Sequence, residues 1–205
     1  MKELHIIRQY IHLKKKEGSK MLSDSKQAIM DASMRLMETK DFNSITVREI
    51  AAEARVNIAA INYHFGNKTK LFNLLMESYW REMMVFYEEL LTTQEITIDY
   101  AIAFGIKVLK FELCSTGILR SEQVMYQQYG VDEATQKRIN IQFQALSRLV
   151  LALHKEVKKE EVFPKVLMIA SALSCPGFWS DLTESYVTDI DSFAESYVGN
   201  LMNSI

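Results

Sequence analysis

A cluster of polar and aromatic side chains in the first third of the chain has the chemistry needed to bind a nucleic acid. Thr46, Tyr63, His64 and Lys68 can donate hydrogen bonds to phosphate oxygens. Asn62 can form two hydrogen bonds with the N6 and N7 atoms of adenine in a major groove. Lys68 also stands at the predicted start of a helix, where backbone N–H groups attract phosphate. Tyr63 and His64 could instead be core residues, but their position at a polar helix end favours contact with phosphate.

Neighbouring side chains widen this candidate surface. Ala59 or Ala60 can touch a thymine methyl group, and the same exposed helix face as Ala59 should carry Asn57 and Ile58. Arg48 is either a phosphate contact or a solvated i,i+4 partner within its own helix. The predicted DNA-binding residues are therefore Thr46, Arg48, Asn57, Ile58, Ala59, Asn62, Tyr63, His64 and Lys68.

No arrangement of residues indicates catalysis or metal binding. The four histidines have no metal-ligand spacing with carboxylates or cysteines, and no glycine-rich phosphate loop is present. Cys114 and Cys175 have no adjacent base in the sequence, which favours structural thiols over redox sensors. We therefore expect a protein that is not an enzyme and that has no cofactor and no metal.

Helix-start signals follow one another closely around the candidate surface. Thr46 and Glu49 form a T-x-x-E capping box, and Asn57 and Asn67 are the next N-cap residues. A longer helix is predicted over 24–40. Together these helices form a compact trihelical unit. Two short helices joined by a tight turn inside this unit suggest a helix-turn-helix.

Composition extends the helical prediction to the whole chain. Seven glycines and two prolines in 205 residues cannot serve the many turns of an all-β fold. Pro176 should kink or split its helix because it lacks an N–H group. Beyond the trihelical unit, helices are expected over 68–92, 96–114, 119–129, 132–159, 162–185 and 188–204. Along 132–159, one apolar face is predicted, formed by Ile139, Phe143, Leu146, Val150, Leu153 and Val157.

The net charge of −2 conceals an asymmetry. Residues 1–80 carry 13 Lys/Arg and 9 Asp/Glu, a balance of +4, whereas residues 81–205 carry 11 and 17, a balance of −6. A basic front suggests contact with an anion, although chance asymmetry is the alternative.

No apolar run approaches the ~20 residues of a membrane span. Together with two cysteines and no signal peptide, this predicts a cytoplasmic protein with no membrane partner.

The stretch from Ile45 to Lys68 resembles the DNA-binding domain of the tetracycline-repressor (TetR) family. The features that carry the resemblance are Thr46 opening a helix, Ile50-Ala51 within it, Val56 in the turn, the Tyr63-His64-Phe65 ending and Lys68. By motif it covers residues 24–80, and over 81–205 it rests on helix count and length. Arg55 and Asp41 depart from the family pattern, which usually has glycine at both corners. A left-handed backbone at Arg55 would cost about 1–2 kcal/mol.

The resemblance implies an all-α fold with an N-terminal three-helix helix-turn-helix DNA-binding domain followed by a helical ligand-binding and dimerisation bundle. The expected domains are a 1–22 extension (an extra helix or basic arm), 23–67 for DNA binding, and 68–205 for regulation and dimerisation. The implied function is a homodimeric repressor that binds a palindromic double-stranded DNA operator and is released by a small, largely apolar effector. Two alternatives remain: a similar DNA binder answering to a protein partner, and a helical adaptor that never binds DNA.

Aromatic residues supply candidates for the effector and dimer sites. The last two long predicted helices are the candidate interface, with Phe178, Trp179, Phe193 and Tyr197 as anchors or, alternatively, as intramolecular core. Gln127 or Gln128 would orient a ligand. The predicted pocket lining consists of Phe86, Tyr100, Phe104, Phe111, Met125, Tyr126, Tyr129 and Phe143, although such residues are more often plain core.

Overall fold

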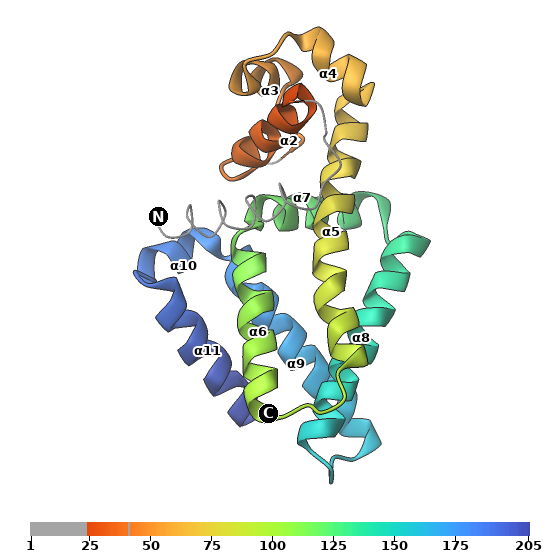
Figure 1. Ribbon diagram of the computed structural model, residues 1–205, viewed down its shortest axis with the longest axis vertical. Helices are drawn as coiled ribbons and strands as arrows, with labels where there is room; N and C mark the ends of the chain where they lie inside the picture. Colours follow the sequence, from red (N-terminus) through yellow and green to blue (C-terminus); the bar gives the residue numbers. More distant parts are fainter. Residues whose placement is uncertain (1–23, 41) are drawn as a thin grey trace. The chain divides into compact units, whose positions relative to one another are not determined.

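The computed structural model describes residues 24–40 and 42–205, and all regular structure in these ranges is helical (Figure 1). The 1–22 extension and Asp41 lie outside the described residues, as do the side chains of Met125, Gln128, Tyr129 and Ser180. No helix among the described residues is long and apolar enough to cross a membrane. The helices are α2 (Asp24–Met37), α3 (Val47–Ala54), α4 (Ile58–Phe65), α5 (Lys68–Thr92), α6 (Ile98–Leu113), α7 (Thr116–Tyr129), α8 (Glu133–Leu153), α9 (Lys159–Phe178), α10 (Ser180–Tyr186) and α11 (Ile190–Ser204).

The helices belong to two compact units. The first, called the head unit, comprises the described residues of 24–80 together with 115–129. The second, called the body unit, comprises 81–114 and 130–205. Helix α7 therefore packs with the N-terminal helices, although helices of the body unit precede and follow it in the chain.

Side-chain caps define the starts of the head helices, as the sequence predicts. The Thr46 hydroxyl accepts a hydrogen bond from the Glu49 N–H at 3.2 Å, and the Thr46 N–H donates to the Glu49 carboxylate at 2.7 Å, which completes the capping box. Asn57 Oδ1 accepts from the Ala59 N–H at 2.9 Å and begins α4. Asn67 Oδ1 accepts from the Lys70 N–H at 2.9 Å at the start of α5. These caps satisfy N–H groups that have no partner inside their helices.

The head core joins α2, α3, α4 and the first turns of α5. Ile29, Ile50, Ile61 and Leu71, one from each helix, are fully buried. Val56, in the turn between α3 and α4, is half-buried.

Arg55 adopts the left-handed conformation considered in the sequence analysis, at a corner where the TetR family usually has glycine. Its φ of 55° and ψ of 42° place it at the end of α3, and it is the only non-glycine residue with positive φ among those described. The turn is closed by hydrogen bonds from the Arg55 N–H to the Ala52 carbonyl (3.2 Å) and from the Val56 N–H to the Ala51 carbonyl (2.9 Å). The helix-turn-helix corner is thus built without glycine, at a conformational cost.

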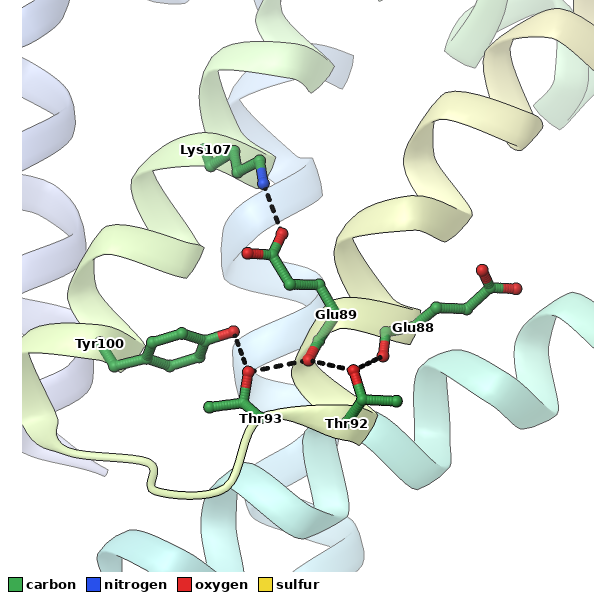
Figure 2. A network of polar contacts seen from close by, with 6 residues as sticks. All are labelled: Glu88, Glu89, Thr92, Thr93, Tyr100 and Lys107. Atoms are coloured by element: carbon green, nitrogen blue, oxygen red, sulfur yellow. Dashed lines mark hydrogen bonds and ion pairs between the residues drawn. The ribbon is translucent and has the colours of Figure 1, made fainter.

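In the body unit, side chains satisfy the carbonyls at the end of α5 (Figure 2). The hydroxyls of Thr92 and Thr93 donate to the Glu88 and Glu89 carbonyls at 3.0 and 2.8 Å, and the Tyr100 hydroxyl lies 2.9 Å from Thr93 Oγ1. The Arg148 guanidinium donates to the carbonyls of Leu90 and Thr93. An ion pair of 2.7 Å between Lys107 and Glu89 further joins α6 to α5. No glycine is needed to end this 25-residue helix.

The helix predicted over 162–185 is split, as expected, but the break lies at Trp179 and not at Pro176, because α9 continues through Pro176 to Phe178. Proline cannot donate to the Ala172 carbonyl four residues earlier. The Tyr197 hydroxyl of α11 donates to that carbonyl at 2.8 Å instead. The predicted 162–185 helix therefore breaks at Trp179, where α10 follows.

Other boundaries also differ from the prediction. Helix α7 begins at Thr116, before the expected 119, and α8 ends at Leu153, well before 159. On α8, Leu146 and Val150 are buried, but Ile139 and Phe143 are 42% and 39% exposed. The single apolar face expected along 132–159 is therefore buried only over its middle.

We predict that Arg55→Gly stabilises the protein by about 1 kcal/mol, because glycine removes the left-handed penalty while adding flexibility to the unfolded chain. Urea unfolding measures the change. The matched control is Arg55→Ala, which removes the same charged side chain but keeps a Cβ atom. Equal stability of the two variants would contradict the strain at this corner.

We also predict that Glu49 makes stability depend on acid pH. Hydrogen bonds from Lys40 and then from Thr46 lower the Glu49 pKa from 4.5 to about 2. A lowered pKa stabilises the fold above pH 4.5, and this contribution is lost as the pH falls towards 2. Urea titrations at several pH values measure the free energy of unfolding. The difference in this free energy between wild type and Glu49→Gln should therefore be largest above pH 4.5.

The second variant, Lys40→Ala, removes the main cause of the lowered pKa. It should move the loss of stability to higher pH. A wild-type advantage over Glu49→Gln that stays constant from pH 6 to pH 2 would show that Glu49 is not the titrating group.

Candidate nucleic-acid interface

Helix α4 buries one side and exposes the other. Ile61 and Phe65 are 0% and 4% exposed and anchor it in the head core. On the opposite side, Tyr63 is 85% exposed, and Asn62 is also exposed. Asn57, Ile58 and Ala59 are exposed at the N-terminal end of the same helix. The helix is two turns long, so its polar side chains project from a rigid support of a size that fits a major groove.

Thr46 and Asn57 are both exposed and both already act as caps. The Thr46 hydroxyl lies 2.8 Å from the Glu49 carboxylate and donates to it, besides accepting from the Glu49 N–H. Asn57 uses its carbonyl oxygen, and its amide group keeps two N–H donors. A phosphate near Thr46 must therefore share the hydroxyl with Glu49, whereas Asn57 can cap and donate at the same time.

His64 is half-buried at the end of α4 and is linked to α2. Its Nε2 atom lies 2.7 Å from the Ser25 hydroxyl, and its ring meets the Tyr63 ring edge-on, with centroids 5.0 Å apart. Nδ1 is therefore the atom through which His64 would reach a phosphate.

Lys68, at the start of α5, is half-buried. Its ammonium group donates to the Asn43 carbonyl at 3.0 Å and lies 4.7 Å from the centre of the Phe42 ring. Desolvation lowers the pKa of Lys68, and the nearby Glu49 carboxylate opposes that shift. An ammonium group has three N–H donors, so contact with Asn43 does not prevent contact with a phosphate.

The basic character of the head is partly neutralised within it. Lys40 pairs with Glu49 at 2.5 Å, and Arg35 pairs with Glu53 at 2.7 Å. Arg48 and Arg55 are exposed on and just after α3.

Lys70, which the sequence prediction did not include, is exposed in the first turn of α5, two residues after Lys68.

The predicted pocket residues do not form a single group. In the body unit, Phe86 meets Phe111 with ring centroids 5.4 Å apart, and Phe104 meets Tyr87 at 5.6 Å. Tyr100 bonds to Thr93, and the partly exposed Phe143 lies against Phe163. In the head unit, Tyr126 donates to the Glu122 carboxylate. Gln127 is exposed, whereas the side chains of Met125, Gln128 and Tyr129 lie outside the described ones.

The four predicted interface anchors differ in exposure. Phe178 and Trp179 are 40% and 63% exposed. Phe193 and Tyr197 are half-buried and stack on each other, and Tyr197 also donates to the Ala172 carbonyl. The first pair is available to a partner, and the second pair contributes to packing within the chain.

Comparison with known proteins agrees with this geometry. Residues 29–75 match the model of the family described as "Bacterial regulatory proteins, tetR family". The nucleoid occlusion factor SlmA of Serratia proteamaculans (strain 568) is 25% identical over 178 residues, which cover 82% of this chain and 88% of that protein.

Two solved structures share the fold. A proposed fatty acid metabolism regulator from Clostridium perfringens has a TM-score of 0.61 at 17% identity, covering 87% of this chain and 98% of its own. NalD, described as the secondary repressor of the MexAB-OprM multidrug efflux pump in Pseudomonas aeruginosa, has a TM-score of 0.53 at 18% identity, covering 87% and 94%.

The family match contains the capping box, the left-handed corner and the exposed face of α4. The helix-turn-helix within residues 29–75 is therefore of the TetR-family type, and the all-helical fold of the chain is shared with the two solved structures.

Proposed function

We propose that the protein is a homodimeric repressor that binds a palindromic operator and is released by a small-molecule effector. The observation that carries the proposal is the division of α4 into a buried side, Ile61 and Phe65, and an exposed side bearing Asn62 and Tyr63. Such a helix can present side chains to base edges without losing core contacts.

Each predicted contact has a distinct chemical role. Asn62 reads adenine through two hydrogen bonds, and Ala59 and Ile58 offer apolar contact to a thymine methyl. Tyr63, His64 and Lys68 hold phosphates and position the helix, as do Thr46, Arg48 and Asn57. Phosphate contacts provide affinity, and Asn62 provides sequence preference.

A second copy of the chain is the proposed occupant of an exposed apolar surface on α9 and α10. This surface, called the α9–α10 face, comprises Leu167, Met168, Phe178, Trp179, Leu182 and Tyr186, which are between 40% and 82% exposed. Apolar exposure on this scale marks an interaction site. A two-turn reading helix contacts only a few base pairs, so a two-fold partner that reaches a second half-site adds both affinity and specificity.

The effector is proposed to bind in the body unit, among the aromatic pairs of α5 and α6. Phe86 with Phe111 and Tyr87 with Phe104 supply apolar contacts, and the buried Glu112 supplies one polar group. Release requires that the effector prefer the conformation with weaker DNA affinity. A thermal-shift screen of small apolar compounds tests this step, and a true effector must also weaken operator binding.

The SlmA relative supports a second candidate function. That protein is named as a nucleoid occlusion factor, and the similarity extends well beyond the helix-turn-helix. In this alternative the body unit binds a protein partner, which regulates DNA binding in place of a small molecule. DNA binding that a cell extract modulates, and that small molecules leave unchanged, would favour it over the effector model.

We predict that Tyr63→Ala weakens binding to a duplex selected by the wild-type chain from a random library. The loss should be about fivefold, because one hydrogen bond to phosphate is removed. Fluorescence anisotropy measures the affinity. Val85→Ala is the control, since Val85 is 53% exposed and lies on α5, outside both α4 and the α9–α10 face. Equal affinity of the Tyr63 and Val85 variants would count against α4 as the reading helix.

We also predict that Trp179→Glu converts a dimer into a monomer, because a carboxylate would be desolvated at the centre of the α9–α10 face. Sedimentation equilibrium measures the mass. Val85→Glu, on α5, provides the control, since Val85 is 53% exposed and lies outside the face. Retention of the dimer in Trp179→Glu, or its loss in Val85→Glu, would exclude this face as the interface.

A further inference from the structure

Arg120 of α7 completes the C-terminal end of α2. Its guanidinium donates to the Glu38 carbonyl at 2.6 Å and to the Met37 carbonyl at 3.4 Å. The preceding carbonyls of Arg35 and Leu36 accept from the chain's own turn, through the N–H groups of Glu38 and Lys40 at 3.2 and 3.1 Å. A helix end carries unsatisfied carbonyls and a partial negative charge, which a guanidinium satisfies well.

Gly117 lets α7 approach this helix end closely. A Cβ atom at Gly117 would lie 2.2 Å from the Met37 carbonyl oxygen and 2.5 Å from its carbon. Both are backbone atoms, which cannot move aside as a side chain can. The contact between α7 and α2 therefore requires glycine at this position.

The two residues after Arg120 bond to two further parts of the head unit. The Ser121 hydroxyl accepts from the Phe42 N–H at 3.4 Å and donates to the Gly117 carbonyl at 2.8 Å. The Glu122 carboxylate, which is 6% exposed, accepts from the Trp80 indole N–H of α5 at 2.5 Å. Residues 120–122 thus contact the end of α2, the segment after it, and α5.

The segment that Arg120 and Ser121 hold leads directly to the proposed DNA contacts. Phe42 stacks on Phe72 with centroids 4.5 Å apart and lies under the Lys68 ammonium. Lys68 donates to the Asn43 carbonyl. The capping residue Thr46 follows the same segment in the chain.

We propose that Gly117, Arg120 and Ser121 of α7 are positioning residues for DNA binding, which fix residues 38–40 and 42–45 and thereby the phosphate contacts of Thr46 and Lys68. None of them needs to touch DNA. This positioning role rests on the proposed DNA-binding function alone and is independent of any effector.

The test compares two arginines that each cap a helix end in the full-length chain. Arg120→Ala removes the cap of α2 in the head unit, and Arg148→Ala removes the cap of α5 in the body unit. The probe is a duplex that the wild-type chain selects from a random library. We expect Arg120→Ala to lower its affinity about tenfold and to reduce the salt slope by roughly 0.9 per lost phosphate contact. Arg148→Ala should leave the affinity and the slope unchanged.

A second readout needs no DNA. Amide hydrogen exchange at Thr39, Lys40 and Ile45, whose N–H groups close the turns of this segment, should accelerate in Arg120→Ala and not in Arg148→Ala. Arg120→Lys keeps the charge and one donor and should restore part of both effects. If Arg120→Ala does not fold, Arg120→Lys is measured alone and should show intermediate affinity and exchange. A folded Arg120 variant with wild-type affinity, salt slope and exchange would overturn the proposal.

Discussion

The structure depends on satisfying the polar groups at helix ends in a chain that has only seven glycines. Helix starts are satisfied by Thr46, Asn57, Thr97, Asp132 and Asp189, each of which accepts an N–H from the first turn. Glycine in a left-handed conformation is the usual end of a helix. Here arginine side chains from other helices take over that function at the ends of α2 and α5. Because these donors are distant in sequence, each helix end becomes a tertiary contact.

The same constraint explains why a proline is tolerated inside α9. Pro176 leaves the Ala172 carbonyl without its usual donor, and the Tyr197 hydroxyl supplies one from α11. Burial raises the pKa of Tyr197, and the negative charge of a Cys175 thiolate acts in the same direction, so the hydroxyl remains a donor at neutral pH. A residue that the sequence suggested as an anchor for a second copy is therefore used to join two helices of one chain.

Local signals predicted the head well, because its determinants are close in sequence. The capping box of Thr46 and Glu49, the cap at Asn57 and the suspect corner at Arg55 are all patterns within a few residues. The packing of α7 with the head was not predictable in this way. It depends on Gly117 meeting Met37, and on Arg120 reaching the end of α2 some 80 residues earlier. The exposure of Ile139 and Phe143 was missed for a similar reason, since apolar periodicity cannot say where a neighbouring helix stops.

The internal bonds of the proposed phosphate contacts bear on how the head achieves specificity. Thr46 shares its hydroxyl with Glu49, His64 bonds to Ser25, and Lys68 is held by Asn43. These bonds restrict the side chains before DNA arrives, so less rotamer entropy is lost on binding. The same bonds must be shared or exchanged when a phosphate arrives, which limits the affinity gained from each contact. In the proposed interface, these phosphate contacts orient the head on the duplex, and discrimination between sequences is assigned to the exposed residues of α4, above all Asn62. In the proposed interface, a small displacement of residues 38–40 and 42–45 should weaken DNA binding, because Thr46 and Lys68 would then no longer be oriented towards the phosphates.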